Sequence, residues 1–171
     1  MIKIEDLVGG YRDNLILNRV SLKVYEGEIF VILGASGCGK STLMKHMIGL
    51  IKPNEGRVII DGDDIWRVDE KQFKAYLRKI GVLFQGGGLL GSMTVAENIS
   101  LPLTEFTNLP PRLIDSMVEM KLNLVNLEGV GNHMPAELSG GMKKRAGLAR
   151  AMALNPKILF FDEPSAGLDP I

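Results

Sequence analysis

The sequence predicts an α/β protein whose sheet is mainly parallel and covered by helices. Short apolar runs, typical of strands, alternate along the chain with segments of helical periodicity. Two of these runs, at 29–33 and 158–161, are apolar throughout, which favours strands buried on both faces. A mostly helical stretch at about 88–155 is inserted between the strand-rich parts. We therefore expect a single domain over 1–171, with a core at 1–87 and 156–171.

The individual elements follow from apolar runs and turn residues. Short β-rich runs bounded by glycine, asparagine or aspartate predict strands at 2–8, 22–25, 28–33, 57–60, 80–84 and 158–161. Helical patterns predict helices at 40–48, 68–79, from Pro110-Pro111 to about 126, and from Ser139 to about 154. Thr94 and Glu97 form a capping box for a further short helix.

Two features of the C-terminal half carry further expectations. Gly86-Gly87-Gly88 is expected to be a flexible hinge. The helix after Pro110 has one apolar face, and we expect this methionine-rich face to lie in the core rather than at a contact surface. Its residues are Leu113, Met117, Met120 and Leu124.

Composition narrows the function classes. The chain is 46% hydrophobic and 23% charged, with 20 basic and 20 acidic residues. A neutral balance gives no electrostatic reason to expect nucleic acid or an anionic membrane surface as a partner. The single cysteine, Cys38, fits a reducing compartment, and no apolar run is long enough to span a bilayer.

A glycine-rich motif joins a predicted strand to a predicted helix. Residues 34–42 match the phosphate-loop pattern G-x-x-x-x-G-K-[ST] in its full strand–loop–helix setting. Such a loop turns its N–H groups towards phosphate oxygens, and the helix N-terminus attracts the same anion. We expect Lys40 to reach the β- and γ-phosphates of ATP and Ser41 to bind Mg²⁺. The expected phosphate-loop contacts are Gly34, Ser36, Gly37, Cys38, Gly39, Lys40, Ser41 and Thr42.

The last predicted strand ends in two acids, Asp162 and Glu163. In open α/β folds ligands bind at the carboxyl edge of the sheet. The strand places Asp162 and Glu163 at that edge. We expect Asp162 to help hold Mg²⁺ and Glu163 to orient or deprotonate the attacking water. A solvated acid pair is the alternative for this segment alone, and the phosphate loop upstream favours the functional interpretation.

A third motif points to a family. Leu138-Ser139-Gly140-Gly141-Met142 precedes a predicted helix, and the acidic strand follows shortly afterwards. With the phosphate loop upstream, this order and spacing resembles the ABC ATPase family over essentially the whole chain. The resemblance implies a P-loop NTPase fold with a parallel core sheet, an N-terminal antiparallel β subdomain and an inserted α-helical subdomain.

The resemblance also implies roles for single residues. Ser139, Gly140 and Gly141 would face the ATP of a second subunit, so that two chains enclose two nucleotides. Gln85 matches the Q-loop glutamine, which contacts Mg²⁺ or the water; with Lys40 and Glu163 it completes the expected catalytic set.

Two further matches to the family are weaker. Tyr11 stands where an aromatic ring stacks on adenine, with a core tyrosine as the alternative. Asp169 resembles the D-loop aspartate that crosses the dimer interface.

A basic run follows the signature. Lys143, Lys144 and Arg145 lie near a helix N-terminus, where cations oppose the helix dipole. Our hypothesis is that one of them is stabilised by binding a phosphate held by the second subunit. The alternative is that all three lie on a solvent-exposed face of the helix.

The implied partners are a second nucleotide-binding subunit and a membrane-spanning permease, which would place the chain in the cytoplasm, peripheral on the inner membrane. Met142 and its neighbours are similar to the Mla-type phospholipid and toluene-tolerance branch. By the family pattern, the 171 residues end after the D-loop and before the switch histidine. We therefore expect an incomplete sheet with an unpaired edge, and poor hydrolysis by this polypeptide alone.

The competing function is a non-transport ABC ATPase of DNA repair or translation. Repair-type members separate their nucleotide motifs by a long coiled coil, and residues 42–138 show no heptad pattern. Translation-type members carry two cassettes in one chain. Outside the motifs, His46, His133 and the acids at 61, 63 and 64 are expected to be structural, solvated or part of a turn.

Overall fold

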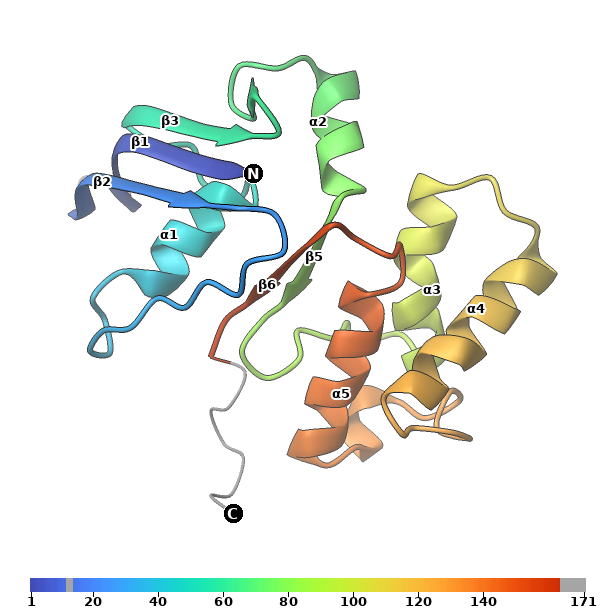
Figure 1. Ribbon diagram of the computed structural model, residues 1–171. Helices are drawn as coiled ribbons and strands as arrows, with labels where there is room; N and C mark the ends of the chain where they lie inside the picture. The colour runs from blue at the N-terminus through green and yellow to red at the C-terminus, as the bar shows by residue number, and fades with distance from the viewer. Residues whose placement is uncertain (12–13, 164–171) are drawn as a thin grey trace. The chain divides into compact units, whose positions relative to one another are not determined.

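The structure, a computed structural model, describes residues 1–11 and 14–163. The chain divides into two compact units, Met1–Tyr76 and Leu77–Ile171 (Figure 1). The division into a core and an inserted subdomain at 88–155 stays a prediction. None of the helices in the described ranges is both long and apolar enough to cross a membrane.

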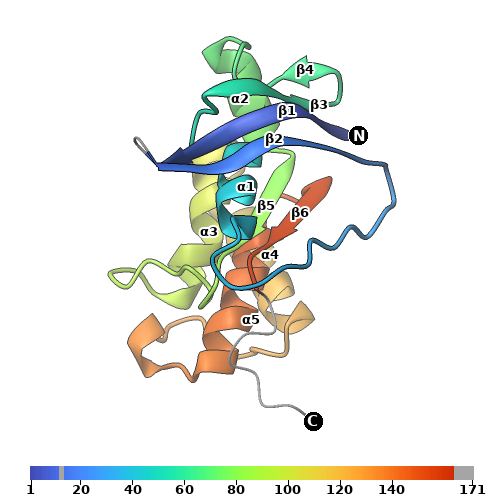
Figure 2. The same cartoon turned by 90° about the vertical axis from the view of Figure 1, so that its left-hand side faces the viewer.

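The N-terminal unit is built on an antiparallel sheet. Its strands are β1 (Ile2–Tyr11), β2 (Asn14–Val24), β3 (Glu55–Ile60) and β4 (Asp63–Asp64). Their order in the sheet is β2-β1-β3-β4, with β1 between its two long neighbours (Figure 2). Alternate residues of the central strands, such as Ile4 and Val58, are buried, as the two-residue period of a strand requires.

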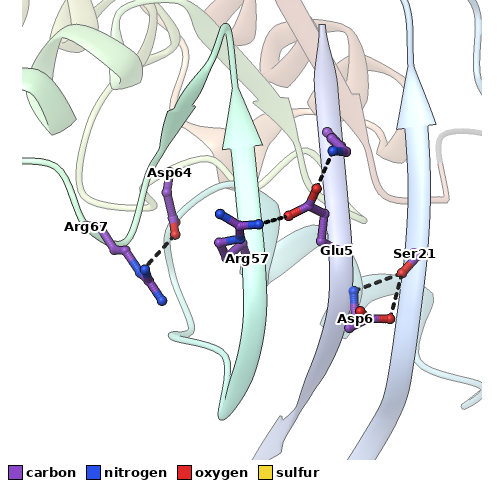
Figure 3. A network of polar contacts seen from close by, with 7 residues as sticks. Glu5, Asp6, Ser21, Arg57, Asp64 and Arg67 are labelled. Atoms are coloured by element: carbon purple, nitrogen blue, oxygen red, sulfur yellow. Dashed lines mark hydrogen bonds and ion pairs between the residues drawn. The ribbon is translucent and has the colours of Figure 1, made fainter.

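A polar network on this sheet joins neighbouring strands (Figure 3). Glu5 of β1 pairs with Lys3 and, at 2.5 Å, with Arg57 directly across on β3. The Lys3 hydrogen bond and the two positive charges lower the pKa of the Glu5 carboxyl. At the adjoining irregularity of β1, Asp6 has a φ of 45°, and its N–H donates to Ser21 Oγ at 2.8 Å. Such exposed pairs fix register more than they add stability.

Two helices accompany this sheet, α1 (Lys40–Met47) and α2 (Glu70–Leu77). The C-terminal end of α1 is held by distant side chains. The indole N–H of Trp66 donates to His46 O at 3.2 Å, and the Tyr76 hydroxyl donates to Met47 O at 2.6 Å. These bonds satisfy carbonyls that have no partner within a helix. Burial raises the pKa of Tyr76, which keeps its phenol protonated as a donor.

The strand predicted at 28–33 is wrong. In the structure this segment has no regular secondary structure, and its apolar side chains are exposed, with Ile29 at 93% and Leu33 at 87%. A strand exists only where a neighbour completes its ladder of hydrogen bonds. Within the described residues, neither sheet supplies such a neighbour for 28–33.

The C-terminal unit contains three helices packed side by side, α3 (Val95–Phe106), α4 (Pro111–Leu124) and α5 (Gly140–Ala151) (Figure 1). A short 3₁₀ helix, η1 (Pro135–Glu137), precedes α5. The shared core includes Val95, Ile99, Val118, Leu122 and Ala149. The predicted capping box at Thr94 and Glu97 is confirmed, because each side chain accepts a hydrogen bond from the backbone N–H of the other.

The predicted core face of α4 is wrong for three of its four residues. Leu113, Met120 and Leu124 are 51%, 61% and 65% exposed, whereas Met117 is half-buried and packs against the core as expected. The helix packs instead through Val118 and Leu122. Both sets recur at helical spacing, so the apolar pattern alone does not decide which face is buried.

The parallel core sheet that the sequence predicts is confirmed for two strands. Strand β5 (Ile80–Leu83) pairs in parallel with β6 (Ile158–Phe161), from Ile80 opposite Ile158 to Leu83 opposite Phe161. The two strands therefore deliver the residues that follow them to the same edge.

The buried His46 predicts a pH dependence of stability. Burial lowers the pKa of this imidazole below its ordinary 6.5. Above pH 6.5 the folded and unfolded states are both neutral at this site, but below it the unfolded state binds the proton more readily. The free energy of unfolding should therefore fall as the pH decreases from 7.5 to 5.5, as measured by urea denaturation. His46→Gln should flatten this dependence, whereas His133→Gln, at an exposed histidine, should not; an unchanged slope in His46→Gln contradicts the assignment.

Candidate functional site

The glycine-rich loop ends in the first turn of α1. Gly37 and Gly39 have φ angles of 79° and 101°, which are accessible to glycine at little cost. Gly39 is the N-cap residue, and a Cβ there would lie 2.9 Å from the side chains of Ile16 and Leu17. Because glycine has no capping side chain, the first turn of α1 presents its amides and its positive dipole end to an anion.

Lys40 lies across this loop. Its ammonium donates to Gly34 O and Ala35 O, both at 2.9 Å, and lies 4.0 Å from Cys38 Sγ. A Cβ at Gly34 would lie only 2.6 Å from that sulfur, so the Cys38 thiol packs directly against the backbone of Gly34. The structure thus collects a cation and a helix N-terminus at one place, and their contact with phosphate stays a prediction.

Tyr11 is at the end of β1 and is not part of the core. Its side chain is 43% exposed, and Lys45 Nζ donates to its hydroxyl oxygen at 2.8 Å. The exposed ring is compatible with stacking on a base, and the alternative of a core tyrosine does not fit.

At the carboxyl ends of β5 and β6, polar side chains meet. Gln85 follows β5, and its Nε2 donates to Glu163 Oε2 at 3.3 Å. Asp162, which follows β6, is half-buried, and its N–H donates to Leu83 O at 2.9 Å. The structure therefore brings Gln85, Asp162 and Glu163 to one edge, because the two strands are parallel.

The oxygen donors of the predicted magnesium ligands suit that cation. Mg²⁺ prefers carboxylate, amide and hydroxyl oxygens. Asp162 and Gln85 supply the first two at the β5–β6 edge, and Ser41 supplies a hydroxyl at the start of α1. The chemistry of these residues therefore fits Mg²⁺.

The signature residues begin α5. Ser139 is the N-cap, and its Oγ accepts from Met142 N at 3.2 Å. Ser139 and Gly140 are exposed, and a Cβ at Gly140 or Gly141 would meet no atom of the described residues within 4 Å. Contacts inside this unit therefore do not account for either glycine.

Of the basic run, Arg145 is used by the fold. Its Nη1 donates to Val125 O at 3.1 Å and to Asn126 O at 2.7 Å, carbonyls at the C-terminal end of α4. The hypothesis that one residue of the basic run contacts a phosphate held by a second subunit stays a prediction. The predicted D-loop, which includes Asp169, lies outside the described residues.

The glycine loop after β5 is fastened to α5, a contact that the sequence analysis missed. All three glycines, Gly86 to Gly88, have positive φ, and their expected role as a flexible hinge stays a prediction. However, a Cβ on Gly147 of α5 would lie 2.3 Å from Gly87 O, so the two backbones touch. Arg150 Nη1 also donates to Gly88 O at 2.7 Å, and burial lowers the pKa of this arginine. The sequence signal that could have indicated this contact is Gly147, a glycine in the interior of a predicted helix.

Because of this contact, we expect Gly147→Ala to lower the stability of the protein, which is the opposite of the usual effect of this substitution in a helix. In a helix interior, glycine to alanine ordinarily stabilises by about 1 kcal/mol. Here the added methyl group would meet the Gly87 backbone, so Gly147→Ala should destabilise by about 1–3 kcal/mol. The measurement is urea unfolding followed by far-ultraviolet circular dichroism. Gly91→Ala is the control, because its Cβ meets nothing within 4 Å in the described residues; a stabilised Gly147→Ala would show that the close contact is absent.

Comparison with known proteins places these motifs in a family. The family model for the ABC transporter matches residues 17–166. The chain is 42% identical over 171 residues to the intermembrane phospholipid transport system ATP-binding protein MlaF of Haemophilus influenzae, covering 100% of this chain and 65% of that protein. It is 44% identical over 170 residues to the probable ribonucleotide transport ATP-binding protein mkl of Mycobacterium leprae, covering 99% and 49%.

A solved structure agrees. The dimeric structure of a post-hydrolysis state of the ATP-binding cassette MJ0796, bound to ADP and Pi, superposes with a TM-score of 0.90 at 34% identity. The match covers 99% of this chain and 76% of that chain. The chain spans between about half and about two thirds of the length of these curated relatives. With its phosphate loop, acidic strand end and signature helix, this chain belongs to the ABC transporter family.

Proposed function

We propose that this chain is the ATP-binding and ATP-hydrolysing subunit of a bacterial ABC transporter that moves phospholipids. The observation that carries the proposal is the position of Lys40, whose ammonium lies across the glycine loop at the start of α1. Family membership and the pairing of Gln85 with Glu163 support it.

Binding begins with the phosphates. The Lys40 ammonium donates to two neutral carbonyls of its own loop. Phosphate oxygens are charged and accept stronger hydrogen bonds, so ATP would draw the ammonium from the loop to the β- and γ-phosphates. The amides of the first turn of α1 and residues 34–39 would cradle the same oxygens. Tyr11, with its exposed ring, would stack on the base.

Hydrolysis requires a base that faces the water. Glu163 is exposed at the carboxyl edge, and the Gln85 amide donates to its carboxylate. We assign Glu163 the role of accepting the proton of the attacking water and Gln85 that of orienting the carboxylate. Mg²⁺, held by oxygens of Ser41, Gln85 and Asp162, would neutralise phosphate charge.

The signature suggests a second copy of this chain as partner. Ser139 and Gly140 are exposed at the start of α5, and the cassettes of MJ0796 are dimeric in their solved structure. We propose that two copies enclose two ATP molecules, with each signature facing the partner's nucleotide. A permease would supply the membrane spans and hold the pair at the cytoplasmic face of the inner membrane. DNA repair and translation are not favoured, since the curated relatives are named for transport.

The names of the relatives differ on cargo. MlaF is named for phospholipid and mkl for ribonucleotide transport. We favour phospholipid, because the match to MlaF covers the larger share of the relative. The test is transfer of labelled phospholipid between vesicles by the assembled transporter, with a labelled ribonucleotide as the competing cargo. Uptake of the ribonucleotide alone would reverse the choice.

Lys40→Ala should weaken ATP binding by about 10- to 100-fold, because a charge-assisted hydrogen bond to phosphate is lost. Isothermal titration calorimetry of the full chain with Mg·ATP measures the change. Lys74→Ala, at an exposed lysine of α2, is the matched control and should bind like the parent. Unchanged ATP affinity in Lys40→Ala would remove the proposed phosphate site.

Glu163→Gln should lower kcat by about 10²- to 10⁴-fold while ATP affinity is kept, because the amide cannot accept the proton of the water. Phosphate release by the assembled transporter, together with ATP titration, separates the two quantities. Glu128→Gln removes an exposed acid elsewhere in the same unit and should leave both unchanged. Turnover of Glu163→Gln at the parental rate would assign the base to another group.

A further inference from the structure

Two consecutive residues of α1 contact β1 near its end. Lys45 Nζ donates to the Tyr11 hydroxyl oxygen at 2.8 Å and lies 5.3 Å from the centre of the ring. The second distance is nearly the sum of the first and the span from a phenol oxygen to its ring centre. The ammonium therefore lies beyond the hydroxyl end of Tyr11 rather than above a face of the ring, so this contact does not obstruct stacking.

The next residue, His46, supports the same strand from within the core. Its side chain is 0% exposed, and its Nδ1 lies 2.6 Å from Ile51 O. Because a carbonyl only accepts, Nδ1 carries the proton, and Nε2 of the neutral ring carries the lone pair.

That second nitrogen faces β1. A Cβ on Gly9 would lie 2.4 Å from Nε2, so the backbone of β1 rests directly on the imidazole. Among the described residues, Nε2 has no hydrogen-bond partner. The ring therefore fills space under Gly9, and within the described part of the chain its hydrogen bond is to Ile51 O.

A stacking side chain contributes to binding only if its ring is fixed relative to the rest of the ligand site. Tyr11 is 43% exposed at the end of its strand, so burial alone does not fix its side-chain torsions. Lys45 holds the hydroxyl, and His46 holds the backbone two residues earlier. Both belong to the helix that starts at Lys40, and five residues of helix correspond to about 7.5 Å along its axis.

Resting on the proposed ATP site, we propose that Lys45 and His46 are positioning residues, which hold the ring of Tyr11 at a fixed distance from the phosphate-binding first turn of α1. Neither residue contacts the nucleotide in this proposal. They act on the base end of the ligand through Tyr11, and the phosphate end is served by Lys40 and the loop. Affinity for a nucleoside polyphosphate should therefore depend on them, and affinity for the polyphosphate alone should not.

The experiment compares ATP with inorganic tripolyphosphate, which lacks the base. In the full chain, Lys45→Met removes the donor at similar side-chain length, and Lys45→Arg restores a donor. By calorimetry, Lys45→Met should weaken ATP binding about tenfold and change tripolyphosphate binding less than about twofold. Lys45→Arg should recover most of the ATP affinity. In a Tyr11→Leu background, Lys45→Met should have no further effect on ATP, because the two residues act through one contact.

Equal weakening for ATP and tripolyphosphate would overturn the proposal, since Lys45 would then act on the phosphates by its charge. Unchanged ATP affinity in Lys45→Met would overturn it as well. Lys40→Ala distinguishes a failure of this proposal from a failure of the proposed ATP site. This variant should weaken the binding of both ATP and tripolyphosphate, and if it weakens neither, the proposed function itself fails. Gly9→Ala, which pushes β1 from His46, should weaken ATP and spare tripolyphosphate, while the Lys45 series decides the matter if that variant does not fold.

Discussion

Helix α1 depends on hydrogen bonds at the end opposite to the phosphate loop. An isolated helix of eight residues is marginal in water, because few turns offset the cost of nucleation. Trp66 and Tyr76 donate to the carbonyls of its last turn, and the His46 side chain bonds to Ile51 O just beyond it. The helix therefore cannot slide along its axis without breaking these bonds, and its N-cap, Gly39, keeps its place next to Ile16 and Leu17 of β2.

Much of the fold could be predicted because its signals are local. The capping box at Thr94, the N-cap at Ser139 and the glycine turn before α1 each depend on neighbouring residues. The failures concern information that is not local. Residues 28–33 have the composition of a buried strand but lack a partner strand in the described residues. Helix α4 has two apolar stripes, and tertiary packing buries Val118 and Leu122, while only Met117 of the methionine-rich stripe packs against the core.

In the candidate site, too, some features could be predicted from the sequence and others could not. The phosphate loop and the acids after β6 follow from motifs, and the meeting of Gln85 with Glu163 follows from parallel strands. The supporting contacts could not be predicted. Gly9 looks like a strand breaker in the sequence, but in the structure it makes room for His46. Arg145 looks like a cation near a helix dipole, but it binds the carbonyls that end α4.

Tryptophan and tyrosine, the side chains that dominate intrinsic fluorescence, are unevenly distributed. Trp66 is the only tryptophan of the 171 residues, and the three tyrosines, Tyr11, Tyr25 and Tyr76, also fall within Met1–Tyr76. Intrinsic fluorescence therefore reports on the N-terminal unit alone, and the indole that bonds to the end of α1 places this reporter beside the nucleotide-binding helix. The unit that carries the signature helix contains neither tryptophan nor tyrosine, so a fluorophore attached there would give a signal separate from that of the N-terminal unit.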